Sequence, residues 1–269
     1  MPPARWFARI GLAAVVAAFH VSTFAQTPAA SAGMPDPALV QDLVAANHIL
    51  YDQGVVDGFG HVSVRHDKSP DRFLMARSMA PALVTADDIM EFDLDGNAID
   101  ARGRAVYLER FIHSEIYKTR PDVKAIVHSH SPAVIPFGVT GVPLRPVFHL
   151  TAFLGTGVPV FEIRDAGGDA TDLLVRNPTL GAALAKTLGD KTGALMRGHG
   201  SVAVGNSLQQ VVYRAVYTEV NARLQSDAMR LGTVNFLTPG EAAKAAITGD
   251  GLIGRPWDLW KRRAMKDAK

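Results

Sequence analysis

The feature that most constrains the fold of this chain is a histidine pair, His128 and His130, at the end of an apolar run. Side chains alternate between the two faces of a β-strand, so a strand over residues 123–130 points both imidazoles to one side and Ser129 to the other. A third histidine, His199, stands between two glycines, which allow a sharp turn next to a ligand. Together they offer three nitrogen ligands to a divalent metal. Three protein ligands with the remaining positions open are typical of a catalytic metal.

A carboxylate adds to this candidate site. Glu109 begins the helix predicted over residues 107–120, which leads into the histidine strand. From there it can point over the metal as a general acid or base. The alternative is a first-turn glutamate that the helix dipole favours. His113, one turn further on, is expected to pack or to support a ligand rather than to bind the metal.

The hydrophobic pattern predicts alternating strands and helices in one α/β domain with a mixed or antiparallel sheet. Strands are expected over residues 61–65, 73–76, 90–94, 123–130, 158–163, 193–197 and 201–204. Helices are expected over residues 35–52, 107–120 and 208–231, and in a basic tail around residues 257–260. The strand over 61–65 alternates like a half-buried one.

Charge and composition exclude several classes. The formal net charge of +2 is small, and no basic run is interleaved with aromatic residues, so nucleic acid is not an expected partner. The chain has no cysteine, which rules out disulfides and thiolate chemistry.

The first 25 residues resemble a secretory signal peptide. Arg5 and Arg9 precede an apolar run that is short for a membrane span, and small residues follow near Ala25. The chain is therefore expected to divide into a leader (1–25), a linker (26–37), a catalytic domain (38–235) and a helical tail (236–269). A cleaved leader places the protein in the periplasm or outside the cell, without membrane attachment. The alternative is a cytoplasmic protein.

Four segments together resemble the class II aldolase/adducin family over residues 38–235. They are Gly60-His-Val-Ser-Val-Arg65, Glu109-Arg-Phe-Ile-His113, Arg120-Pro-Asp-Val-Lys-Ala-Ile-Val-His-Ser-His130 and Gly198-His-Gly200. The resemblance implies a single α/β/α domain with a central, largely antiparallel sheet, and a homotetramer with active sites at subunit interfaces.

The same resemblance assigns roles to residues. It makes His128, His130 and His199 the metal ligands and Glu109 the acid/base. It aligns His149 with a tyrosine that family aldolases lend from a neighbouring subunit as a proton donor. Zinc is the favoured metal, with manganese, cobalt or iron as alternatives.

Departures from the family's sugar-phosphate aldolases point to another substrate. His61 replaces an Asn, Arg77 and Ser78 replace a Thr-Gly pair, and Tyr107-Leu108 replaces two serines. A phosphate needs several charge-assisted donors, which these changes remove. Arg77 can instead hold a carboxylate in a bidentate way, with His61 and Ser78 as further substrate-binding residues.

These replacements resemble a subgroup that includes decarboxylases of dihydroxyphthalate-type and carboxymuconic-semialdehyde-type acids. The sequence thus predicts a metal-dependent carbon–carbon lyase that decarboxylates a non-phosphorylated hydroxy or keto acid through a stabilised enolate. The alternatives are a retro-aldolase of a hydroxy-keto acid, an iron-dependent oxygenase and a non-catalytic, adducin-like binding protein.

Overall fold

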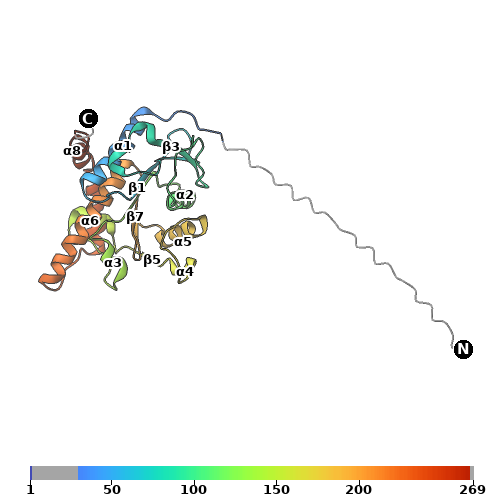
Figure 1. Cartoon of the computed structure of the whole chain (residues 1–269). Coiled ribbons are helices and arrows are strands. Elements are labelled where there is room, and N and C mark those ends of the chain that lie inside the picture. The colour runs from blue at the N-terminus through green and yellow to red at the C-terminus, as the bar shows by residue number, and fades with distance from the viewer. Residues whose placement is uncertain (2–29, 267–269) are drawn as a thin grey trace.

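The structure is a computed structural model that describes residue 1 and residues 30–266. The expected leader lies almost wholly in residues 2–29, outside the described residues. A seven-stranded sheet stands in the middle of the molecule, with helices on both faces (Figure 1). The expected α/β/α fold with a largely antiparallel sheet is confirmed.

The strand order in the sheet is β3-β2-β1-β4-β7-β6-β5. The strands are β1 (His61–Arg65), β2 (Arg72–Ala76), β3 (Ile89–Asp93), β4 (Ala125–Ser129), β5 (Val160–Phe161), β6 (Gly193–Met196) and β7 (Gly200–Gly205). All neighbours pair antiparallel except β5 and β6, which are parallel. The two strands that carry the histidine motifs, β4 and β7, are therefore direct neighbours at the centre.

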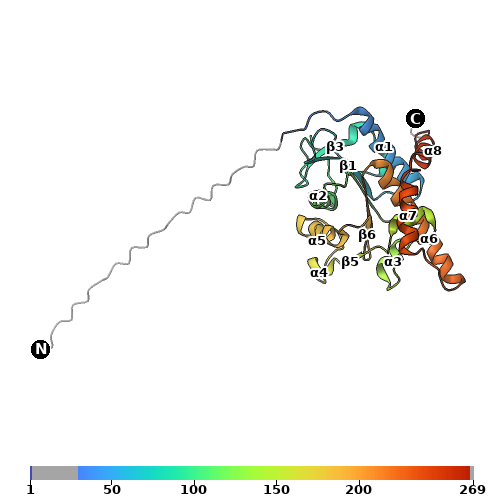
Figure 2. The same cartoon turned by 180° about the vertical axis from the view of Figure 1, so that it is seen from behind.

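Helices cover both faces of this sheet, as the view from behind also shows (Figure 2). One face is covered by α1 (Pro37–Asp52), α6 (Leu208–Leu231) and α8 (Gly254–Ala264). The other is covered by α2 (Arg110–Thr119) and α5 (Pro178–Leu188), with the short α4 (Arg164–Gly167) beside α5. The remaining helical segments are α3 (Ile135–Val139), α7 (Pro239–Asp250) and the 3₁₀ turns η1 (Pro81–Leu83), η2 (Ala86–Asp88) and η3 (His149–Leu154).

Local signals explain where the main helices begin. The Ser207 side chain accepts a hydrogen bond from the Gln210 N–H, which caps α6 at the predicted start. The sequence interpretation missed α5, although Asn177 caps it and Pro178 occupies its first position. Helix α2 begins at Arg110 rather than at Tyr107, so that Glu109 takes the cap position.

The prediction that β1 is half-buried is wrong, because helices pack on both of its faces. All five of its side chains are buried. Val62 and Val64 belong to the hydrophobic core on the α1 and α6 side. His61, Ser63 and Arg65 face α2, where each finds a polar partner. The alternation is real, but it separates an apolar layer from a buried polar one.

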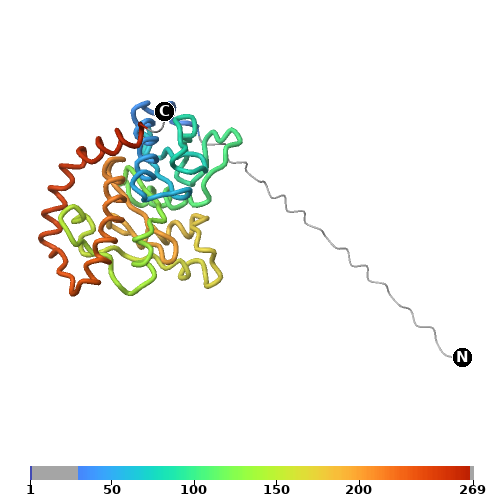
Figure 3. Tube along the Cα trace, turned by 60° about the vertical axis from the view of Figure 1, so that its left-hand side comes forward, coloured from blue at the N-terminus to red at the C-terminus, as the bar shows by residue number. Residues whose placement is uncertain are grey.

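The C-terminal segment packs on the domain. Helix α7 lies against η3, and α8 contributes Trp257 and Trp260 to the core that α1 and α6 build. In Figure 3 this segment runs along the outer edge of the molecule beside α6. Among the described residues, no helix combines the length and the apolar character that a membrane crossing requires.

Candidate metal centre

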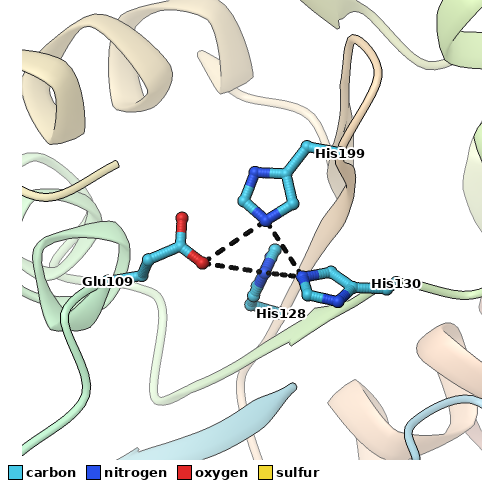
Figure 4. Close-up of side chains that lie close together, drawn as sticks. All are labelled: Glu109, His128, His130 and His199. Carbon is cyan, nitrogen blue, oxygen red and sulfur yellow. Dashed lines mark hydrogen bonds and ion pairs between the residues drawn. The ribbon is translucent and has the colours of Figure 1, made fainter. Parts of the chain in front are cut away.

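Three histidine side chains converge on one point at the end of β4 (Figure 4). His128 lies within β4, and His130 follows directly after its last residue. The Nε2 atom of His130 is 3.1 Å from Nε2 of His128 and 2.9 Å from Nε2 of His199. The structure thus brings together the three histidines that the sequence singled out.

A tight β6–β7 hairpin delivers His199 to this point. Gly198 has a φ of 67°, in the left-handed region that favours glycine. At Gly200, a Cβ atom would lie 2.1 Å from the carbonyl oxygen of Ser129. Only a residue without a side chain lets β7 approach the end of β4 this closely. The two glycines that flank His199 therefore have separate roles, one in the turn and one in the strand contact.

Backbone carbonyl groups fix the tautomers of two of the histidines. His128 Nδ1 lies 3.1 Å from the Ser201 oxygen, and His199 Nδ1 lies 2.9 Å from the Leu173 oxygen. A carbonyl oxygen only accepts, so each Nδ1 must carry the proton and donate it. The Nε2 atom of each ring then presents a lone pair to the centre, as a metal ligand does.

Glu109 completes the cluster from the first position before α2. Its Oε1 accepts a hydrogen bond of 2.8 Å from the Val175 N–H. Its Oε2 lies 3.3 Å from His199 Nε2 and 3.6 Å from His128 Nε2. Both the Val175 N–H and the Leu173 carbonyl come from one loop, in which Leu173 has a φ of 70°. This loop therefore braces the carboxylate and one histidine at once.

The electrostatics of the cluster favour an ionised Glu109 carboxylate beside His128 and His130 rings that are neutral at pH 7. Burial raises the pKa of Glu109, but the neighbouring His199 and His128, when they carry a proton towards it, and the Val175 N–H outweigh burial and lower the pKa to about 2. Burial lowers the pKa of His128 well below its ordinary value, and that of His130 also falls. When the imidazoles are neutral, the hydrogen bond from the Val175 N–H still favours the ionised carboxylate.

This donor set fits a divalent cation. The four ligand atoms lie within 4.8 Å of one another. His130 Nε2 lies close to Nε2 of both His128 and His199, and one N–H on His130 can donate to only one of them. The remaining short contacts, including those with the carboxylate oxygen, therefore join two acceptors with no proton between them. Bonds of about 2.1 Å to a common ion would place neighbouring nitrogens about 3.0–3.4 Å apart, close to the observed contacts of 3.1 and 2.9 Å.

Three members of the cluster, Glu109, His128 and His130, line a cavity of about 480 Å³. The larger side chains that line it are mostly apolar: Phe59, Met79, Tyr107, Leu108 and Leu174. The side chains of Phe59 and Leu108 are 69% and 59% exposed, so they form the rim.

The other predicted site residues fall into two groups. His61 and Ser78 line the cavity. Arg77 is outside its lining, and its Nε donates to Asp88 Oδ1 at 2.7 Å, so a role as carboxylate clamp would require this ion pair to open. His149 is exposed at the start of η3, packed edge-on against Phe148, and does not line the cavity of its own chain. Its expected role at a neighbouring subunit stays a prediction.

Sequence reasoning expected His113 to pack or to support a ligand, but it did not foresee which groups support the site. His113 is fully buried and lies 2.6 Å from His61, a link that the shared face of β1 and α2 could have suggested. The main-chain groups of Leu173 and Val175 leave no trace in the sequence, since any residue supplies them.

Comparisons with known proteins agree with this geometry. The family model described as "Class II Aldolase and Adducin N-terminal domain" matches residues 41–226. "Decarboxylase tropJ" of Talaromyces stipitatus is 37% identical over 252 residues, which cover 85% of this chain and 95% of that protein. The "3,4-dihydroxyphthalate decarboxylase" of Arthrobacter keyseri is 31% identical and covers 71% of this chain and 78% of that protein.

Among solved structures, an "L-fuculose 1-phosphate aldolase" has the same fold. The TM-score is 0.69 at 22% sequence identity, over 80% of this chain and 97% of the aldolase. With the fold, the motifs and the matched relatives in agreement, the chain belongs to the class II aldolase and adducin family.

Proposed function

We propose that the protein is a metal-dependent carbon–carbon lyase that decarboxylates a non-phosphorylated hydroxy or keto acid derived from an aromatic compound. The observation that carries this proposal is the convergence of three imidazoles and one carboxylate, three of these four groups lining a largely apolar cavity. That the chain is a lyase follows from the decarboxylases among its relatives and from its class II aldolase fold.

The metal would be held by His128, His130 and His199, and zinc is the metal that we propose for three imidazoles. When bound, a divalent cation supplies a Lewis acid that withdraws charge from the oxygens of the substrate. The carbonyl partners of His128 and His199 keep both rings in the ligating tautomer before any ion arrives.

Glu109 is the group that moves a proton. It is the only carboxylic acid among the described residues that line the cavity. Its Oε1 is occupied by the Val175 N–H, which leaves Oε2 to face the substrate. Because the carboxylate is ionised in the free protein, it takes up the proton of the substrate hydroxyl. It then returns this proton to the carbon that carbon dioxide leaves.

The walls of the cavity select the substrate. Among the described residues that line it, none is lysine or arginine. A phosphate dianion would therefore lack charge-assisted donors there. The rings of Phe59 and Tyr107 instead offer flat apolar surface to a planar ring. The relatives named for 3,4-dihydroxyphthalate support an aromatic diacid as the first candidate.

The test measures metal and carbon dioxide together. Purified protein is analysed for bound metal, and a panel of hydroxylated aromatic and keto acids is screened for release of carbon dioxide. The His128→Ala/His130→Ala double variant should lose both metal and activity. The matched control is His48→Ala, which removes a histidine that bonds the Val84 carbonyl away from the cavity. Absence of metal above background in the unmutated protein overturns the proposal.

A retro-aldolase is the second candidate, because the solved structures with this fold include aldolases. Cleavage of a carbon–carbon bond next to a carbonyl leaves the same enolate in both reactions. Release of pyruvate and an aldehyde from a hydroxy-keto acid, without carbon dioxide, would favour this candidate.

Two properties of the whole protein are part of the proposal. We propose a homotetramer in which a neighbouring subunit lends His149, and export through cleavage of the first 25 residues. Light scattering on the purified protein measures the assembly. Amino-terminal sequencing of the protein from its native host tests the cleavage.

A further inference from the structure

A row of buried polar side chains lies between β1 and α2, beneath the metal centre. His61 and Ser63 alternate on β1, and His113 and Tyr117 are one turn apart on α2. Each of the four is at most 4% exposed. His61 Nδ1 lies 2.6 Å from His113 Nε2, His113 Nδ1 lies 2.6 Å from Ser63 Oγ, and Ser63 Oγ lies 2.8 Å from Tyr117 Oη. The row is thus one continuous chain of hydrogen bonds.

The Tyr117 end of the row determines which atom donates in each of its hydrogen bonds. Among the described residues, the hydrogen-bond partners of the Tyr117 hydroxyl are Ser63, at 2.8 Å, and the Lys124 carbonyl, at 3.4 Å. The second distance is longer than the roughly 2.5–3.0 Å of an ordinary O–H···O bond, and that carbonyl also accepts a hydrogen bond of 2.7 Å from the Arg65 N–H. The Tyr117 hydroxyl therefore donates to Ser63, its much closer neighbour.

The donor and acceptor of each following hydrogen bond can then be assigned in turn, from Ser63 to His61. Ser63 has accepted from the tyrosine and donates its own hydrogen to His113 Nδ1. Burial lowers the pKa of His113 to about 3, so this ring is neutral and carries its one proton on Nε2. That N–H donates to His61 Nδ1. Because Nδ1 of His61 accepts this hydrogen bond, the one ring proton of His61 lies on Nε2.

The Nε2–H group of His61 is the one that remains to donate to a group in the cavity. His61 lines the cavity and pairs directly with His128 across β1 and β4, with the two ring centres 5.0 Å apart. A neutral donor at this position binds an anionic oxygen without the repulsion that an imidazolium would exert on a metal cation.

We propose that His113 is a positioning residue that fixes His61 as a neutral Nε2–H donor to the carboxylate of the substrate. The proposal rests on the proposed function for its substrate. The tautomer of His61, however, is a property of the protein alone, so the two can fail separately.

The first experiment measures this tautomer in metal-free protein without substrate. Long-range ¹H–¹⁵N spectra distinguish protonated from bare ring nitrogens, and His61→Asn and His113→Phe variants assign the signals. We expect His61 to carry its proton on Nε2 and the His61 tautomers to mix in His113→Phe. A proton on Nδ1 of His61 in the unmutated protein would overturn the inference, whatever reaction the enzyme catalyses.

The second experiment is a double-mutant cycle on turnover. Removing a preorganised donor costs about a hundredfold in kcat, which we expect for His61→Asn. Loss of a supporting partner costs about tenfold, which we expect for His113→Phe with bound metal unchanged. His113→Gln, which keeps a donor and an acceptor, should recover most of the activity. The double variant should be no slower than His61→Asn alone, because His113 acts only through His61.

The matched control is Ser114→Ala, the next residue on α2. Its hydroxyl is buried and has no hydrogen-bond partner among the described residues, so its loss should leave turnover and metal content unchanged. Additive effects of the His61 and His113 substitutions would show that His113 has only a structural role and would refute the inference.

Discussion

Replacing Glu109 by glutamine should stabilise the metal-free protein while it abolishes catalysis. The Val175 N–H can donate only to an oxygen, so the amide oxygen of the new side chain must take the place of Oε1. The amide nitrogen then takes the place of Oε2, 3.3 Å from the lone pair of His199 Nε2. A contact between two acceptors becomes a hydrogen bond.

The magnitude follows from the change in that one contact. A net hydrogen bond contributes about 1 kcal/mol. A gain of about 1 kcal/mol, at about 2–4 °C per kcal/mol, raises the melting temperature by about 2–4 °C. Turnover should fall by about 10²–10⁴, since the proton-transferring oxygen is lost.

The assay is thermal unfolding at pH 8, where ordinary imidazoles are neutral, after treatment with a chelator and again after zinc is added. Metal binding stabilises the unmutated protein according to its affinity and should stabilise Glu109→Gln less. The control is Glu115→Gln on α2. The carboxylate of Glu115 lies 2.9 Å from Lys118 Nζ, and neither residue lines the cavity. That substitution should lower both melting temperatures alike, by the equivalent of at most about 1 kcal/mol. A metal-free Glu109→Gln protein that melts below the unmutated one would refute the description of the cluster as crowded acceptors.

Two further predictions follow from the same structure. Gly200→Ala forces a Cβ against the Ser129 carbonyl and should cost about 3 kcal/mol in urea unfolding, together with bound metal. Phe59→Ala removes an exposed rim residue, so steady-state kinetics should show KM for an aromatic acid raised about tenfold at an unchanged melting temperature.

The metal cluster could be predicted because its ligands stand in short, recognisable sequence patterns. His128 and His130 are two residues apart and so share one face of a strand, and His199 is flanked by two glycines that indicate a turn. The sheet order that joins β4 to β7 then follows from the family resemblance rather than from the residues alone. Glu109 was found because it begins the helix that precedes the strand.

The parts that sequence reasoning did not reach depend on tertiary partners. Asp88, eleven positions from Arg77, engages the guanidinium that was expected in the cavity. A polar alternation in β1 resembles solvent exposure, whereas α2 buries it and supplies its partners. Neither the Arg77–Asp88 pair nor the contacts between β1 and α2 can be predicted from the sequence, because they depend on how the elements pack.

The loop that holds Leu173 and Val175 couples two equilibria. It accepts from His199 and donates to Glu109, so opening of this loop releases a ligand and the proton-transferring carboxylate in one event. Leu173 is in the left-handed region, which costs a non-glycine residue about 1–2 kcal/mol, so the closed loop stores a small opposing energy. Linkage is reciprocal: an ion that binds the closed loop more tightly disfavours the open loop by the same free energy with which closure tightens the binding of the ion. Metal occupancy and access of the loop to solvent should therefore change together.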